Sequence, residues 1–184
     1  ALKMKKYMAI LVCLILSMTM TSLAHDPRTV AKEMGVSLSI EGSGDLEINY
    51  KSLAFNAESY GRFRNDADLR NRLNKGIWNR IGKAQLGFEL IVGGETLTPG
   101  DYDFGLNIDA NDAFSLVFSK GDLAKTIPTK VVTTGNISHL ILALIPTNSP
   151  DTFLLEGRCG TFRATAEVKV PYLKDDHDPH PAEN

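Results

Sequence analysis

Apolar residues at every second position constrain the fold of this chain more than any other feature of its sequence. In residues 161–170 they form one unbroken row of Phe162, Ala164, Ala166, Val168 and Val170. Successive side chains of a β-strand point to opposite faces, so this row can be buried while Arg163 and Glu167 meet water. The same period recurs over residues 102–109. The pattern predicts a mainly β protein.

Turn-forming residues separate many short strands. Gly93-Gly94 is typical of a two-residue hairpin turn, and Pro99-Gly100 of a turn with a positive φ at the glycine. Residues 140–145 are apolar throughout, which predicts a strand covered on both faces. The predicted strands cover residues 36–41, 46–51, 86–92, 95–97, 102–109, 114–118, 131–134, 140–145, 152–156 and 161–170.

Residues 65–75 are the one segment with a helical pattern. Asn65 or Asp66 can cap its first turn, Leu69 and Leu73 lie four residues apart on one face, and Gly76 can end it. Strands do not alternate with long helices in the pattern, which disfavours a Rossmann or TIM-barrel architecture. We therefore expect an antiparallel β-sandwich or a jelly-roll-like domain with one short helix.

The first 24 residues have the layout of a secretory signal peptide. Three lysines within residues 3–6 precede the apolar residues 8–16, and Ser22 and Ala24 are the small residues that a signal peptidase reads. A helix needs roughly 20 apolar residues to cross a bilayer, so this shorter run does not predict a membrane span. We expect cleavage after Ala24 and a periplasmic or secreted product.

The remaining length predicts a single domain with flexible ends. We expect a loosely held arm in residues 25–35, the β-sandwich domain in residues 36–173, and a disordered acidic, histidine-containing tail in residues 174–184. Of the two cysteines, Cys13 leaves with the leader and Cys159 remains alone, which excludes an internal disulfide.

Positive charge gathers in one segment of an otherwise acidic chain. The formal net charge is −2, and loss of the leader leaves 17 basic against 22 acidic residues, which excludes a generally basic nucleic-acid binder. Residues 62–83, however, carry seven basic and two acidic residues. Arginine forks match the geometry of carboxylates and phosphates. The surface predicted to bind an anionic small molecule or glycan consists of Arg62, Arg70, Arg72, Trp78 and Arg80.

Two other hypotheses stay open beside that surface. The basic residues can form a solvated helix face that pairs with the acidic remainder, with Trp78 in the core. A hydrolase of glycans or esters would need a carboxylate pair such as Glu89 and Glu156, or a thiol such as Cys159 with His139 as its base. The sequence has no nucleophile elbow, phosphate loop or dinucleotide fingerprint. We therefore expect a non-catalytic binding or structural module of the cell envelope, without a metal or cofactor.

Three segments resemble motifs of the DUF2911 family of exported bacterial domains. Residues 94–102 (Gly-Glu-Thr-Leu-Thr-Pro-Gly-Asp-Tyr) are similar to its hairpin, residues 78–84 to its tryptophan segment, and residues 168–171 to its closing Val-x-Val-Pro strand. The segment that starts at Tyr50 lacks the family's Arg-Pro pair. The resemblance implies an exported, mostly β domain and carries over no activity.

Overall fold

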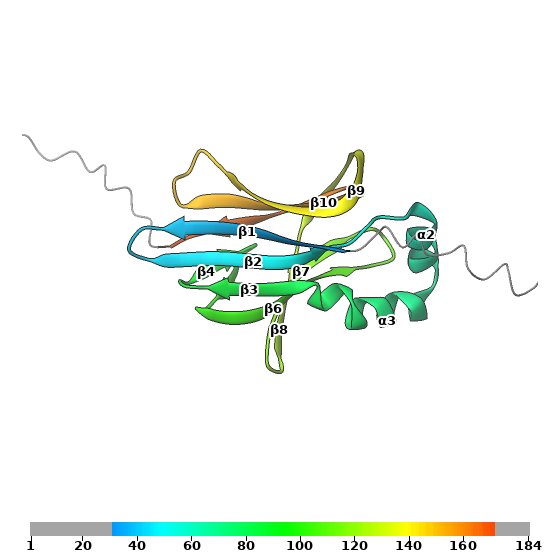
Figure 1. Ribbon diagram of the computed structural model, residues 1–184, viewed down its shortest axis with the longest axis horizontal. Coiled ribbons are helices and arrows are strands. Elements are labelled where there is room, and N and C mark those ends of the chain that lie inside the picture. The colour runs from blue at the N-terminus through cyan, green and yellow to red at the C-terminus, as the bar shows by residue number, and fades with distance from the viewer. Residues whose placement is uncertain (1–30, 172–184) are drawn as a thin grey trace, which may run out of the picture. The chain divides into compact units, whose positions relative to one another are not determined.

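Two antiparallel sheets make up most of the computed structural model, which describes residues 31–171 (Figure 1). This confirms the predicted mainly β, sandwich-like class. The larger sheet has the strand order β1 (Lys32–Ile40), β2 (Gly44–Ser52), β3 (Gly82–Leu86), β6 (Gly100–Ile108), β7 (Phe114–Lys120) and β8 (Leu123–Pro128). The smaller sheet has the order β5 (Glu95–Leu97), β4 (Leu90–Val92), β10 (Thr152–Lys169) and β9 (Lys130–Pro146).

Some predictions concern residues that the structure does not describe. The leader in residues 1–24, its cleavage after Ala24 and the tail in residues 174–184 lie outside the described residues. Within residues 31–171, no helix has the length and apolar character needed to cross a bilayer.

The β1–β2 hairpin begins the described part of the chain. Val36 pairs with Ile48, and both residues lie in strands that the alternation predicted. The hairpin is longer than expected, because the pairing continues outward to Lys32 opposite Ser52. Lys32 lies inside the segment expected to be a loose arm, so the last residues of that arm are part of the sheet.

β9 and β10 form a long ribbon that bends back on itself. The four short strands predicted between residues 131 and 170 are joined into these two. The pairing of the two strands slips around Gly160, which has a φ of 58°. The backbone N–H of Val170 donates to the Asp151 carbonyl at 2.8 Å, although 18 extended residues would span roughly 60 Å. β10 therefore reverses direction near Gly160.

The strand predicted to be covered on both faces has one open face. Leu140 and Leu142 are buried, but Ile141 between them is 42% exposed. β9 is an edge strand of the smaller sheet, and its outer side chains are left on the surface. An apolar run alone does not show whether a second layer covers it, and here the prediction was wrong.

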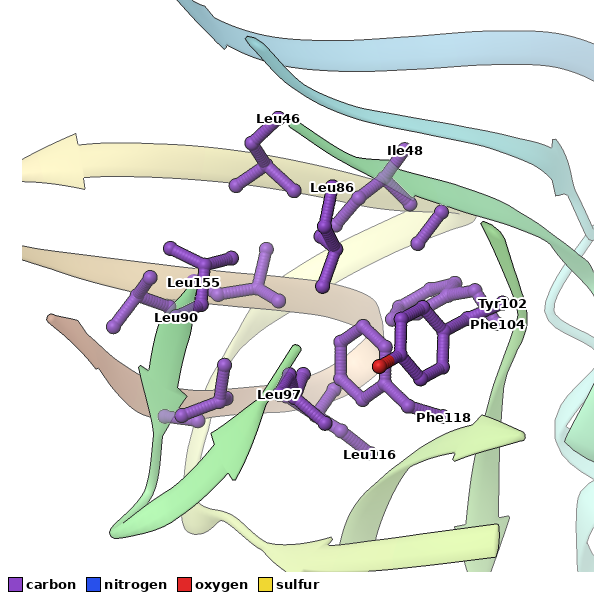
Figure 2. Packing of buried hydrophobic residues seen from close by; sticks show 14 of the residues in the cluster. Leu46, Ile48, Leu86, Leu90, Leu97, Tyr102, Phe104, Leu116, Phe118 and Leu155 are labelled. Atoms are coloured by element: carbon purple, nitrogen blue, oxygen red, sulfur yellow. The ribbon is translucent and has the colours of Figure 1, made fainter. Parts of the chain in front are cut away.

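The core lies between the two sheets. Figure 2 shows the rings of Tyr102, Phe104 and Phe118, with Leu90 and Leu97 of the smaller sheet on the opposite side. Phe104 has no exposed surface, and its ring centroid lies 5.3 Å from that of Phe118 in an edge-to-face arrangement. These side chains are the buried rows that the alternation predicted, and their removal from water stabilises the sandwich.

Hydrogen bonds from β2 tie the larger sheet to β9. The buried Tyr50 hydroxyl accepts the backbone N–H of Leu142 at 2.8 Å, and the Ser52 hydroxyl donates to the Leu140 carbonyl at 2.7 Å. The Leu140 N–H in turn donates to the Leu53 carbonyl at 2.8 Å. These backbone groups of β9 are thus satisfied by β2 and by the residue that follows it.

Two α-helices, rather than the one expected, lie between β2 and β3, followed by the short 3-10 helix η1 (Trp78–Arg80). α3 (Ala67–Gly76) matches the prediction, with the Asp66 side chain accepting the Leu69 N–H at 2.9 Å. α2 (Ala57–Asn65) has Asn56 as its N-cap, and the Asn56 side chain accepts the Ser59 N–H at 2.8 Å. α2 was missed because it contains a glycine and no pair of aliphatic residues four apart.

Candidate functional site

An apolar cavity of about 200 Å³ lies where the helices meet the sandwich. Six aromatic residues line it, from α2, η1, β7, β10 and the segment after β2: Phe55, Tyr60, Phe63, Trp78, Phe114 and Phe162. The remaining lining side chains include Leu73, Leu106, Ile108 and Cys159. Because the lining is mainly apolar, with Asn56 and Ser59 as polar members, the cavity offers water few hydrogen-bond partners and favours an apolar occupant.

Ring-to-ring contacts hold the aromatic side chains in place around this cavity. The centroid of Phe162 lies 5.2 Å from that of Tyr60 and 5.2 Å from that of Phe114. Tyr60 also lies 5.6 Å from Phe55, at a tilt of 42°. Tilted and edge-on rings at these distances attract one another beyond simple area burial. The wall is therefore built before any ligand arrives.

The Tyr60 hydroxyl forms the polar contact of the wall. It donates to the Asp112 carboxylate at 2.8 Å, and the other oxygen of that carboxylate lies 3.5 Å from Arg64 Nη1. Burial, and then the Asp112 carboxylate, raise the pKa of Tyr60 above its ordinary value. Tyr60 therefore stays protonated as a donor, and together with Arg64 it fastens α2 to the β6–β7 loop.

Cys159 presents the one thiol within the described residues to the cavity. Burial raises its pKa to about 11, so the thiol is almost entirely protonated at neutral pH. The hypothesis of a Cys159–His139 pair gains no support, because the Nδ1 atom of His139 lies 3.0 Å from the neighbouring Ser138 hydroxyl and nothing lowers the thiol pKa.

We predict that Cys159 reacts with iodoacetamide about a hundredfold more slowly at pH 8 than an ordinary thiol, because so little thiolate is present. The rate should rise about tenfold per pH unit until the pH nears 11. The folded state favours the neutral thiol, so its stability contribution is complete below the unfolded pKa and declines as the pH rises towards 11. The urea-unfolded chain is the control, and equal rates in both states would contradict the burial.

The structure gives no support to the two glutamates considered as a glycosidase pair. Both oxygens of Glu156 lie against arginines, and among the described residues no contact joins this carboxylate to Glu89. Glu89 lies two residues before Ile91, which pairs with Lys169.

The predicted basic surface is divided among four places. Arg70 donates to the Arg64 carbonyl at 2.8 Å and so closes the end of α2, and Arg80 lies 3.9 Å from Asp103. Trp78 lines the aromatic cavity. Arg62 and Arg72 share a shallow hollow between α2 and α3.

That hollow is electrically balanced. The carboxylates of Glu58 and Asp66 line it together with the guanidinium groups of Arg62 and Arg72. Two positive and two negative side chains give no net charge to attract an anion. Within residues 31–171, no three His, Cys, Asp or Glu side chains lie close enough together to hold a metal ion.

The sequence pointed to two of the cavity residues, Trp78 as a ligand contact and Cys159 as a possible nucleophile. Most of the other members are apolar residues typical of a core, and they come from several separate segments of the chain. The one local signal was Asn56, a typical helix cap, followed by Tyr60 and Phe63 three residues apart on one helix face.

No family model matches this chain, and neither a curated protein nor a solved structure is detectably similar to it. The resemblance to the DUF2911 family stays a prediction.

Proposed function

We propose that this domain is a non-catalytic binding module that holds a small, mainly apolar molecule with one ring in the aromatic cavity. The observation that carries the proposal is a cavity of about 200 Å³ walled by six aromatic side chains. An apolar cavity of roughly 150 Å³ is large enough to take up benzene. A single ring with a small substituent therefore suits this cavity, and a long acyl chain exceeds it.

The chemistry at the cavity supports binding rather than turnover. The Cys159 thiol is held protonated, and the Tyr60 hydroxyl is occupied by Asp112. A nucleophile is activated by a lowered pKa, and burial instead raises the pKa of both side chains. The leader-like residues 1–24 and the resemblance to an exported family support placing this module in the cell envelope.

The apolar cavity is preferred to the anionic ligand first expected for the basic segment. Arg70 and Arg80 make intramolecular contacts, and the hollow at Arg62 and Arg72 has no net charge. Trp78, the aromatic residue of the predicted anion-binding surface, lines the cavity instead.

Trp78 is the only tryptophan of the chain, so its fluorescence reports on the cavity. We predict saturable quenching by bromobenzene. The Cys159→Phe variant, whose added ring fills much of the space, should weaken the affinity at least about tenfold. Cys159→Ala, which leaves the space open, should bind at least as well as the parent.

Circular dichroism and thermal melting establish that each variant is folded, and Leu73→Phe gives a second way to reduce the cavity. Quenching without saturation would contradict the proposal. Equal affinity in a folded Cys159→Phe variant would also contradict it, because the ligand would then lie elsewhere.

A further inference from the structure

Away from the cavity, a buried carboxylate of β10 lies between two arginines. Glu156 is 3% exposed. One of its oxygens lies 2.5 Å from Arg158 Nε, and the other lies 3.0 Å from Arg163 Nε. A buried carboxylate is stable only with close positive partners, and here each oxygen has its own guanidinium group.

The two guanidinium groups are only partly used by this contact. Arg158 Nε donates a hydrogen bond to Glu156, whereas Arg163 Nε lies close to the other carboxylate oxygen but is buried without a hydrogen-bond partner. Among residues 31–171, the terminal Nη groups of both arginines make no hydrogen bond. The side chains of Arg158 and Arg163 are 43% and 44% exposed. Two positive charges against one negative charge leave a net charge of +1 with free N–H groups at the surface.

Apolar side chains flank the two arginines on the same face of the ribbon. Arg158 pairs with Ile141 and Arg163 with Val132 across the β9–β10 ladder, and directly paired residues share a face. Ile141 and Val132 are both 42% exposed. Exposed apolar groups beside free guanidinium forks suit a ligand that has both an anionic and an apolar part.

We propose that Arg158 and Arg163, held in position by Glu156, bind the carboxylate of a small amphipathic acid whose apolar part lies on Ile141 and Val132. Glu156 separates and orients the two forks, so that their outer N–H groups can reach one oxyanion together. Planar guanidinium groups suit this role because each can donate two parallel hydrogen bonds to a carboxylate.

This site is separate from the aromatic cavity. Cys159 and Phe162 line the cavity, whereas their sequence neighbours Arg158 and Arg163 contact Glu156. The bent part of β10 therefore presents different side chains to the two sites. The proposal does not rest on the function proposed for the cavity.

The test is a titration with hexanoate, followed by calorimetry or by the arginine side-chain NMR signals. The double variant Arg158→Lys/Arg163→Lys keeps the charge and removes the forks, and its affinity should fall at least about tenfold. The matched control, Arg62→Lys/Arg72→Lys on the helices, should bind as the parent does. Acetate, which lacks the apolar chain, should bind several-fold more weakly than hexanoate.

A second measurement needs no variant. Hexanoate should protect Arg158 and Arg163 of the intact protein from phenylglyoxal, and mass spectrometry should show no protection of Arg62 and Arg72. The proposal is overturned if hexanoate does not bind, if it protects all four arginines alike, or if the lysine variant binds unchanged. It is also overturned if Cys159→Phe abolishes hexanoate binding, because the acid would then occupy the cavity.

Discussion

Replacing Phe104 with alanine lowers the free energy of unfolding by about 3–5 kcal/mol. The ring has no exposed surface and packs edge-to-face on Phe118 in the centre of the sandwich (Figure 2). Alanine removes the buried ring and leaves a cavity that strands on both sides hold open, so the loss of transfer free energy and the loss of packing add. Urea denaturation followed by far-UV circular dichroism measures the difference.

Leu123→Ala is the matched control for Phe104→Ala. Leu123 belongs to β8 of the same sheet but is 79% exposed, so its truncation should change the free energy of unfolding by less than about 0.5 kcal/mol. If Phe104→Ala cost no more than this control, the interior position of β6 would be refuted.

Replacing Gly105 with alanine destabilises the domain by about 3 kcal/mol and displaces Trp78. A Cβ atom at this position would lie 2.2 Å from the Asn79 carbonyl carbon and 2.4 Å from the Trp78 carbonyl oxygen. Both neighbours are backbone atoms of η1, which cannot swing aside as a flexible side chain can. The short helix must therefore shift, and with it the indole ring that lines the aromatic cavity.

Thermal melting and Trp78 fluorescence together measure this effect. The melting temperature should fall, the emission maximum should move to longer wavelength, and bromobenzene quenching should weaken. Gly135→Ala is the control, since a Cβ there has no neighbour within 4 Å. An unchanged spectrum and melting temperature in Gly105→Ala would show that η1 does not rest on β6 as described.

Gly105 also shows which buried positions the alternation of apolar residues can predict and which it cannot. The period of two correctly predicted that Tyr102, Phe104 and Leu106 face the core. It also assigned Gly105 to the open face of the strand, yet Gly105 is buried beneath η1. Periodicity describes which side chains share a face, but what covers each face depends on contacts between distant parts of the chain.

The bend of the β9–β10 ribbon could not be predicted from the sequence, because it also depends on contacts between distant residues. A Cβ at Gly160 would lie 2.6 Å from the ring of Phe55, and that ring approaches only because Leu53 and Phe55 bond to β9 across the sandwich. The sequence shows both residues, but it does not show that they are in contact, because more than a hundred residues separate them.

Charge was the least reliable guide to the candidate site. Basic residues crowd residues 62–83, but their side chains point to different places once α2 and α3 form. Conversely, Arg163 was predicted to be an ordinary outward residue of a strand, and Arg158 lay between two predicted strands. Their shared contact with Glu156 arises only because β10 reverses direction near Gly160. Local composition therefore predicted α3 and most of the strands. It missed β8, and it placed residues 86–92 in one strand although the chain there passes from β3 to β4 of the other sheet. It predicted the candidate site hardly at all.

Diffraction from crystals soaked in bromobenzene, recorded at the bromine absorption edge, tests the aromatic cavity most directly. Bromine scatters anomalously, so its position is located without reference to the protein. We expect one dominant bromine site, enclosed by Tyr60, Trp78 and Phe162. A bromine site at the molecular surface, or a cavity that stays empty in saturated crystals, would contradict the proposed binding function.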